Sequence, residues 1–129
     1  MTFELWMVLA SVVLLLAQVT IQASLLTKQL GSEYNASPRD EQKPVTGTAA
    51  RAKRMLSNYL ETYPAFIALA LVAVISGGAD WLTAIGAGLY IVARIAYVPL
   101  YLQGVYYIRS LAYIAALVGM LAMVVGIIV

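Results

Sequence analysis

The chain of 129 residues contains neither cysteine nor histidine. The absence of cysteine excludes disulfides, a thiolate nucleophile and thiolate metal sites. The absence of histidine removes the usual general base and the commonest metal ligand, so we expect no metal. Any chemistry therefore depends on arginine, lysine, tyrosine, serine and carboxylate side chains, or on a reactive group that a substrate brings.

Charge is scarce as well. Only 11% of the residues are charged, whereas 63% are hydrophobic. The net charge of +2 is too small to indicate a nucleic-acid partner. A soluble domain of this length has too little interior to bury so much apolar surface, so the surrounding solvent must be lipid. The composition predicts an integral membrane protein.

Four apolar stretches are long enough to cross ~30 Å of hydrocarbon, which takes roughly 20 helical residues. They cover about residues 3–26, 48–76, 80–100 and 106–129. The first lacks a basic leader and a cleavage site, so we expect a retained helix. Short glycine-containing turns join the last three stretches as antiparallel hairpins, and a polar loop, residues 27–47, follows the first. The predicted fold is a single all-α domain over residues 1–129, a four-transmembrane-helix bundle.

Basic residues gather on one side of this predicted bundle. Six of the eight lie in or just after the polar loop: Lys28, Arg39, Lys43, Arg51, Lys53 and Arg54. The opposite side, with both termini and the turn at 77–79, has none. Because cytoplasmic loops of membrane proteins are enriched in lysine and arginine, we expect loop 27–47 and turn 101–106 in the cytoplasm and both termini outside.

A polar stripe interrupts the second apolar stretch. Arg54, Asn58 and Glu61 are spaced i, i+4, i+7, so they share one face of a helix, with Arg51 at its edge. Beyond Glu61 the chain is apolar up to Ile75, which places this carboxylate at least one turn inside the membrane. An ionisable group at such a depth is costly and is by default a functional residue that faces protein or water.

A second stripe lies on the third stretch, where Tyr90, Arg94, Tyr97 and Tyr101 share a face. Arg94 is more than halfway along an apolar span and needs a partner, for which Glu61 is the only carboxylate well inside another span. Such a pair serves equally well as a clamp between helices or as part of a ligand site.

The fourth stretch opens with Arg109 on the same face as Tyr106 and Tyr113. Taken alone, this group is typical of an interfacial anchor. In the third stretch, Gly86 and Gly88 indicate close approach of a neighbouring helix.

Together these stripes predict a cytoplasm-facing cleft with an excess of positive charge. Guanidinium groups suit carboxylates, whereas Glu61 or Asn58 could meet an amino group. A small zwitterion with more than one carboxylate fits this balance. Glutathione is such a molecule, and it carries the thiol that the protein lacks, but the chemistry alone does not single it out from other small anions.

The run Arg54-x3-Asn58-x2-Glu61 resembles the RxxxNxxE signature of the MAPEG family, membrane-associated proteins in eicosanoid and glutathione metabolism. The run Arg94-x2-Tyr97-x3-Tyr101, followed by Arg109, is similar to the second half of the site in that family. With four spans, one long loop and two short turns, the resemblance covers nearly the whole chain.

The resemblance implies a homotrimer in which glutathione, as co-substrate, binds between subunits near the cytoplasmic face. It implies these glutathione-binding residues: Arg51, Arg54, Asn58, Glu61, Arg94, Tyr97 and Tyr101. It implies that Arg109 is the catalytic cation at the thiol, although the spacing leaves Ser110 open. The expected reaction is transferase or peroxidase chemistry on lipophilic electrophiles or hydroperoxides, in a bacterial-type member of the inner membrane in contact with its lipids.

Two other readings remain. The chain could be a small transporter or channel subunit, or a non-catalytic protein with the same fold. A through-path needs polar residues at all depths, whereas the outer halves of the four spans are nearly all apolar, which favours a site open to one side.

Overall fold

The computed structural model describes all residues 1–129 and contains only helices. These are α1 (Phe3–Leu30), α2 (Ser32–Ala36), α3 (Gly47–Ile75), α4 (Trp81–Leu102) and α5 (Ile108–Ile128). All except α2 are long and apolar enough to cross a membrane. At ~1.5 Å per residue, even the 21 residues of α5 reach about 32 Å. The predicted all-α membrane fold with four long helices is confirmed.

The connection between the first two spans is more ordered than the predicted loop 27–47. Helix α1 continues to Leu30 and ends where Gly31 adopts a φ of 93°. Helix α2 then folds back, and Asn35 donates a hydrogen bond of 2.8 Å to Thr27 Oγ1. Gln29 also donates to the Thr46 carbonyl at 3.0 Å. Polar side chains therefore hold the connection against the end of α1.

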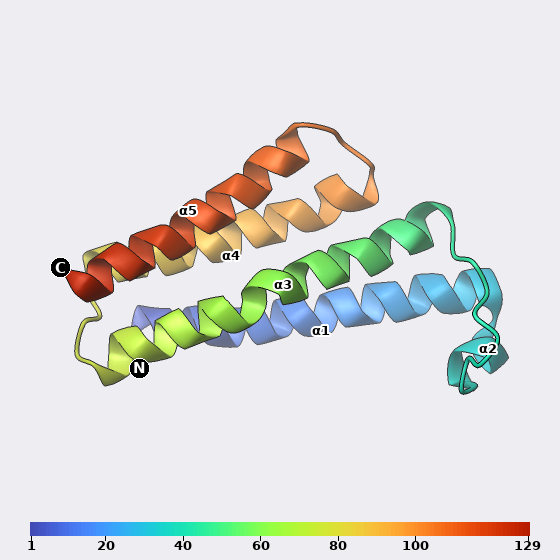
Figure 1. Ribbon diagram of the computed structural model, residues 1–129, viewed down its shortest axis with the longest axis horizontal. Helices are drawn as coiled ribbons and strands as arrows, with labels where there is room; N and C mark the ends of the chain where they lie inside the picture. The colour runs from blue at the N-terminus through green and yellow to red at the C-terminus, as the bar shows by residue number, and fades with distance from the viewer.

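The chain forms two antiparallel pairs, α1 with α3 and α4 with α5 (Figure 1). Both termini and the α3–α4 turn lie at one end, which we call the terminal end (Figure 1). Helix α2 lies at the other, the loop end, where α1 and α3 extend beyond α4 and α5 (Figure 1). The closest packing joins α4 with α5, and α1 does not contact α5. The two pairs thus meet through contacts of α4 with both α3 and α1, and of α3 with α5.

The core lies between these pairs and is rich in aromatic side chains. Phe66 of α3 stacks on Tyr90 of α4, with ring centroids 4.2 Å apart. The Tyr90 hydroxyl is 2.9 Å from Thr62 Oγ1, and Tyr59 donates to the Ser11 carbonyl at 2.8 Å. Since these α3 residues are offset by one position from Asn58 and Glu61, α3 turns one face into the core and the polar stripe sideways.

At the terminal end, α4 and α5 touch through their backbones. A Cβ added to Gly86 would lie 2.4 Å from the Gly119 carbonyl oxygen, and one added to Gly119 would lie 2.6 Å from that of Gly86. No side chain fits at either position. The predicted close approach at Gly86 is confirmed, and the neighbouring helix belongs to the same chain.

Candidate functional site

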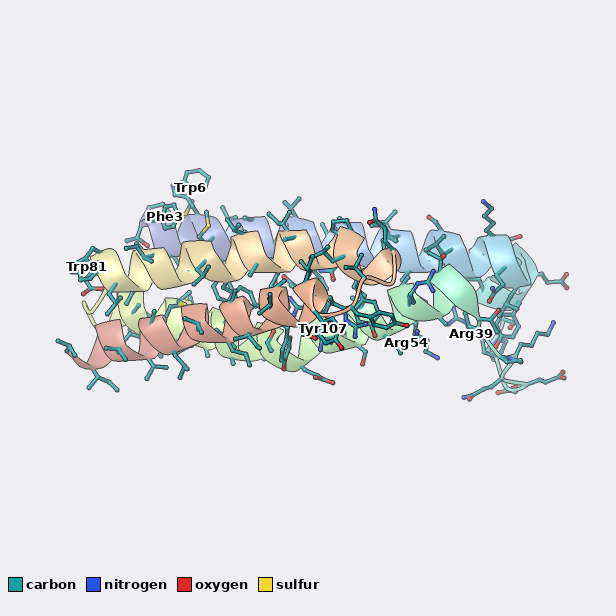
Figure 2. The ribbon with its side chains drawn as sticks, turned by 90° about the horizontal axis from the view of Figure 1, so that it is seen from above. Phe3, Trp6, Arg39, Arg54, Trp81 and Tyr107 are labelled. Carbon is teal, nitrogen blue, oxygen red and sulfur yellow. The ribbon has the colours of Figure 1, made fainter.

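A cleft of about 550 Å³ opens near the loop end, between α3, α4 and α5. Its volume lies within the roughly 300–1,000 Å³ that is typical of sites for small molecules. Its walls consist of Arg54, Ser57, Asn58, Glu61, Tyr97, Tyr101, Arg109, Ser110, Tyr113 and Ile114. Figure 2 shows Arg54 and Tyr107 on the loop-end side of the bundle, well away from Phe3, Trp6 and Trp81.

Three helices supply the walls, and helical spacing explains each contribution. The stripe Arg54, Asn58 and Glu61 faces the cleft from α3, as the i, i+4, i+7 pattern predicts. Tyr97 and Tyr101, one turn apart, face it from α4. The first two turns of α5 bring Arg109 and its neighbours. Six of the eight predicted site residues therefore meet in one cleft, and the other two, Arg51 and Arg94, lie outside it.

Tyr101 connects the two arginines of the cleft wall. Arg54 donates from Nε to the Tyr101 hydroxyl at 3.3 Å. The guanidinium carbon of Arg109 lies 4.8 Å from the centre of the Tyr101 ring, a cation–π contact. The ring of Tyr97 lies 5.4 Å from that of Tyr101. Both guanidinium groups are thus held in the cleft without a carboxylate partner, and their positive charge remains available to an anion.

The predicted pair of Arg94 with Glu61 is wrong. Arg94 donates from Nη1 to Asn58 Oδ1 at 2.9 Å, and its Nε and Nη2 have no hydrogen-bond partner. The register of α4 against α3 brings Arg94 level with Asn58, which lies nearly a turn closer to the loop end than Glu61. The rings of Tyr59 and Tyr97 flank the guanidinium and stabilise its charge. Glu61 itself is exposed at the cleft.

The Arg51 side chain binds the carboxyl end of α4. It donates from Nε to the Leu102 carbonyl at 3.0 Å and from Nη2 to Thr48 Oγ1 at 3.1 Å. A cation at the carboxyl end of a helix satisfies an orphan carbonyl and matches the helix dipole. Arg51 therefore lies at the edge of the stripe, as expected, but its side chain joins α3 to α4 outside the cleft.

Three wall residues were not predicted, Ser57, Tyr113 and Ile114, and a fourth, Ser110, was named only as the alternative to Arg109. The helical spacing from Arg109 to Tyr113 was visible in the sequence, but an anchor at the membrane interface explained it equally well. Ser57 precedes Asn58 and Ser110 follows Arg109, so each serine is the direct neighbour of a predicted wall residue. Ile114 is one apolar residue among many in α5, and no sequence pattern marks it.

The wall combines two guanidinium groups, one carboxylate, one amide, and hydroxyls of tyrosine and serine. This set suits a small ligand with at least one carboxylate and one amino group. Helix α5 begins beside it, and no side chain caps its first amides. The partial positive charge of this helix end adds to that of Arg109. The cleft is thus suited to a ligand with negative charge near Arg109 and Ser110.

Comparison with known families gives one match. A model described as the MAPEG family matches residues 3–129, and thus every helix and every residue of the cleft wall. No curated protein and no solved structure matches the chain.

Proposed function

The chain belongs to the MAPEG family, membrane proteins of glutathione and eicosanoid metabolism, and we propose that it is a membrane-bound glutathione-dependent transferase or peroxidase. The observation that carries the proposal is the meeting of the stripe from α3, the two tyrosines of α4 and Arg109 of α5 in one cleft. No feature of this arrangement favours a transporter or channel subunit, or a non-catalytic protein with the same fold.

The wall complements glutathione group by group. The peptide has two carboxylates, which suit the guanidinium fork of Arg54 and the hydroxyls of Tyr97 and Tyr101. Its single amino group suits Glu61, the only carboxylate in the wall. Its thiol is then left for the side of the cleft formed by Arg109 and Ser110.

Arg109 activates the thiol in this proposal. An unperturbed thiol has a pKa of ~8.5 and is mostly protonated at neutral pH. A guanidinium beside the sulfur stabilises the thiolate and so lowers the thiol pKa, while the proton passes to water. Ser110, next to Arg109 in the cleft wall, donates a hydrogen bond to the same sulfur in this proposal. The thiolate electron pair then forms a bond to an electrophilic carbon, which expels its leaving group as an anion, or to a peroxide oxygen. In the peroxide reaction the O–O bond breaks, the alkoxide leaves and takes a proton from water, and a second glutathione thiol reduces the resulting sulfenic acid to give the disulfide and water.

The second substrate is lipophilic in this proposal and enters from the membrane. Ile114 belongs to the cleft wall, and its side chain is 52% exposed. Leu60 and Leu111 on the flanking helices α3 and α5 are exposed as well. The cleft therefore has an apolar border on its outer side, where a lipid-soluble electrophile or hydroperoxide can approach the sulfur without crossing water.

We also propose that the active form is a homotrimer with its cytoplasmic side at the loop end and both termini outside a bacterial inner membrane. Arg54 and Glu61 are exposed at the rim of the cleft in the single chain. Charged groups near membrane depth are costly when they face lipid, so a neighbouring subunit beside the cleft would protect them. Native mass spectrometry from a mild detergent should show three copies, and a stable monomer that binds glutathione would contradict the shared site.

The test of the function is calorimetric titration of the purified protein in detergent with glutathione. The serine analogue of glutathione, which lacks the thiol, is the matched ligand and should bind with similar affinity. Only glutathione should react with an activated aryl halide or an organic hydroperoxide at a rate above the uncatalysed one. Failure of both ligands to bind would reject the proposal, whereas binding without turnover would indicate a non-catalytic member of the family.

A further inference from the structure

Arg94 lies behind the cleft wall and not in it. Its side chain is 1% exposed and lines no part of the cleft. The guanidinium carbon is 4.4 Å from the centre of the Tyr97 ring and 5.3 Å from that of Tyr59. Two aromatic faces therefore hold a cation that has no counter-charge in the chain, and its only polar partner is Asn58.

This contact determines which end of the Asn58 amide is free. An arginine offers donors and no acceptor, whereas an asparagine amide has an acceptor oxygen at one end and two N–H donors at the other. Oδ1 must therefore face Arg94, from which it accepts at 2.9 Å. The Nδ2 end points away from that contact, and Asn58 is half-buried in the cleft wall.

We propose that Arg94 is a positioning residue, which orients Asn58 so that its amide N–H groups face the cleft. Asn58 then donates to an acceptor oxygen of the ligand, a carboxylate or a carbonyl, and cannot accept from an amino group. This leaves Glu61 as the group that meets an amine. The ligand's identity as glutathione rests on the proposed function, whereas the orientation of the amide does not.

A double-mutant cycle tests whether Arg94 acts through Asn58. Glutathione affinity is measured by calorimetry for the wild type, Arg94→Met, Asn58→Ala and the double variant. Each single substitution should weaken binding about tenfold, the effect of one lost hydrogen bond to a charged ligand. The double variant should bind glutathione no more weakly than the single variant of lower affinity, because each single substitution already removes the hydrogen bond from the Asn58 amide to the ligand. Losses that multiply would make Arg94 an independent contact and overturn the proposal.

Asn58→Asp tests the direction of the hydrogen bond. The aspartate keeps an oxygen towards Arg94 and the same shape, but it presents a second oxygen to the cleft in place of the N–H donors. Glutathione affinity should fall at least about tenfold, because an acceptor then faces an acceptor. Asn35→Asp introduces the same charge in α2, away from the cleft, and should leave affinity within about twofold. Undiminished affinity of Asn58→Asp would overturn the donor assignment.

The unfolding temperatures of the wild type, Arg94→Met, Asn58→Ala and the double variant, measured without ligand, separate this inference from the proposed function. In one outcome, the wild type does not bind glutathione while the effects of Arg94→Met and Asn58→Ala on the unfolding temperature are still coupled. This result would rule out glutathione as the ligand but support the contact between Arg94 and Asn58. Additive effects on the unfolding temperature would reject the contact between Arg94 and Asn58, and with it the inference, whichever ligand binds.

Discussion

The two ends of the bundle use carboxylates in opposite ways. At the terminal end, Glu4 is 3% exposed and accepts a hydrogen bond of 2.5 Å from Thr83 Oγ1, which joins α1 to α4. At the loop end, Glu61 is exposed and takes no part in the hydrogen bonds that join α3 to α4. One carboxylate is satisfied by the fold, and the other is left for something that the chain does not supply.

The helices are also packed more closely at the terminal end than at the loop end. Glycines let α4 and α5 touch at the terminal end, where a Cβ added to Gly126 would lie 2.8 Å from Thr83. At the loop end, tyrosine and arginine side chains stand between the helices, and a cleft remains. A bundle fixed at one end can tolerate large polar side chains and an open site at the other. The close helix packing and the open cleft are thus separated along the helix axis.

The largest effect should follow from a methyl group at the terminal end. Gly86→Ala places a Cβ against backbone atoms of α5 that cannot move aside, so α4 and α5 must separate. We expect a loss of roughly 1–3 kcal/mol or more in folding free energy, the usual cost of overpacking. The measurement is thermal unfolding in detergent. Gly88→Ala is the matched control, because its Cβ would meet only the Phe3 side chain, at 3.3 Å. Equal losses for both would refute the close contact.

Glu61→Gln should act on binding and not on folding. The change removes the only carboxylate of the cleft wall, and glutathione affinity should fall about tenfold, since a charged partner of its amine is lost. Glu4→Gln, the same substitution at the terminal end, should leave affinity unchanged and lower the unfolding temperature. Calorimetry and thermal unfolding of both variants check this reciprocal pattern. If Glu61→Gln unfolds the protein instead, Glu61 belongs to the fold.

The smallest effect should come from Arg51. Its side chain binds the Leu102 carbonyl and Thr48 outside the cleft, although the sequence resemblance implies a role with glutathione. Arg51→Gln should therefore change glutathione affinity by no more than about twofold, because this half-buried charge lies outside the cleft and does not face the ligand. Titration of this variant and of Arg54→Gln, which should bind glutathione more weakly, shows whether Arg51 contacts the ligand or only the end of α4. Equal losses would return Arg51 to the ligand site.

The sequence was sufficient for the parts of the site that lie on one helix. Helical spacing alone places Arg54, Asn58 and Glu61 on one face, and lipid solvent makes a polar face in an apolar span conspicuous. The partner of Arg94 was not predictable in this way. Asn58 and Glu61 differ by less than one turn, so the choice depends on the register between α3 and α4, which packing determines.

Glu4 was missed for a related reason. It lies in the first turn of α1, where an acidic residue is ordinary at the start of a helix. Its burial depends on α4, which is distant in sequence, and on Thr83, whose hydroxyl also takes part in the capping box with Asp80. Long-range contacts of this kind leave no periodic signal in the sequence.

In the proposed function the cleft activates a bound thiol through Arg109, and ultraviolet difference spectra of bound glutathione across pH test this activation most directly. In the wild type we expect the thiolate absorbance to arise at a pH well below ~8.5, the pKa of a free thiol. Arg109→Leu should abolish this signal at neutral pH and leave affinity within about fivefold, whereas Arg109→Lys, which keeps the charge without the fork, should restore part of it. Equal thiolate signals in the three proteins would contradict the claim and reduce Arg109 to an anchor at the membrane interface.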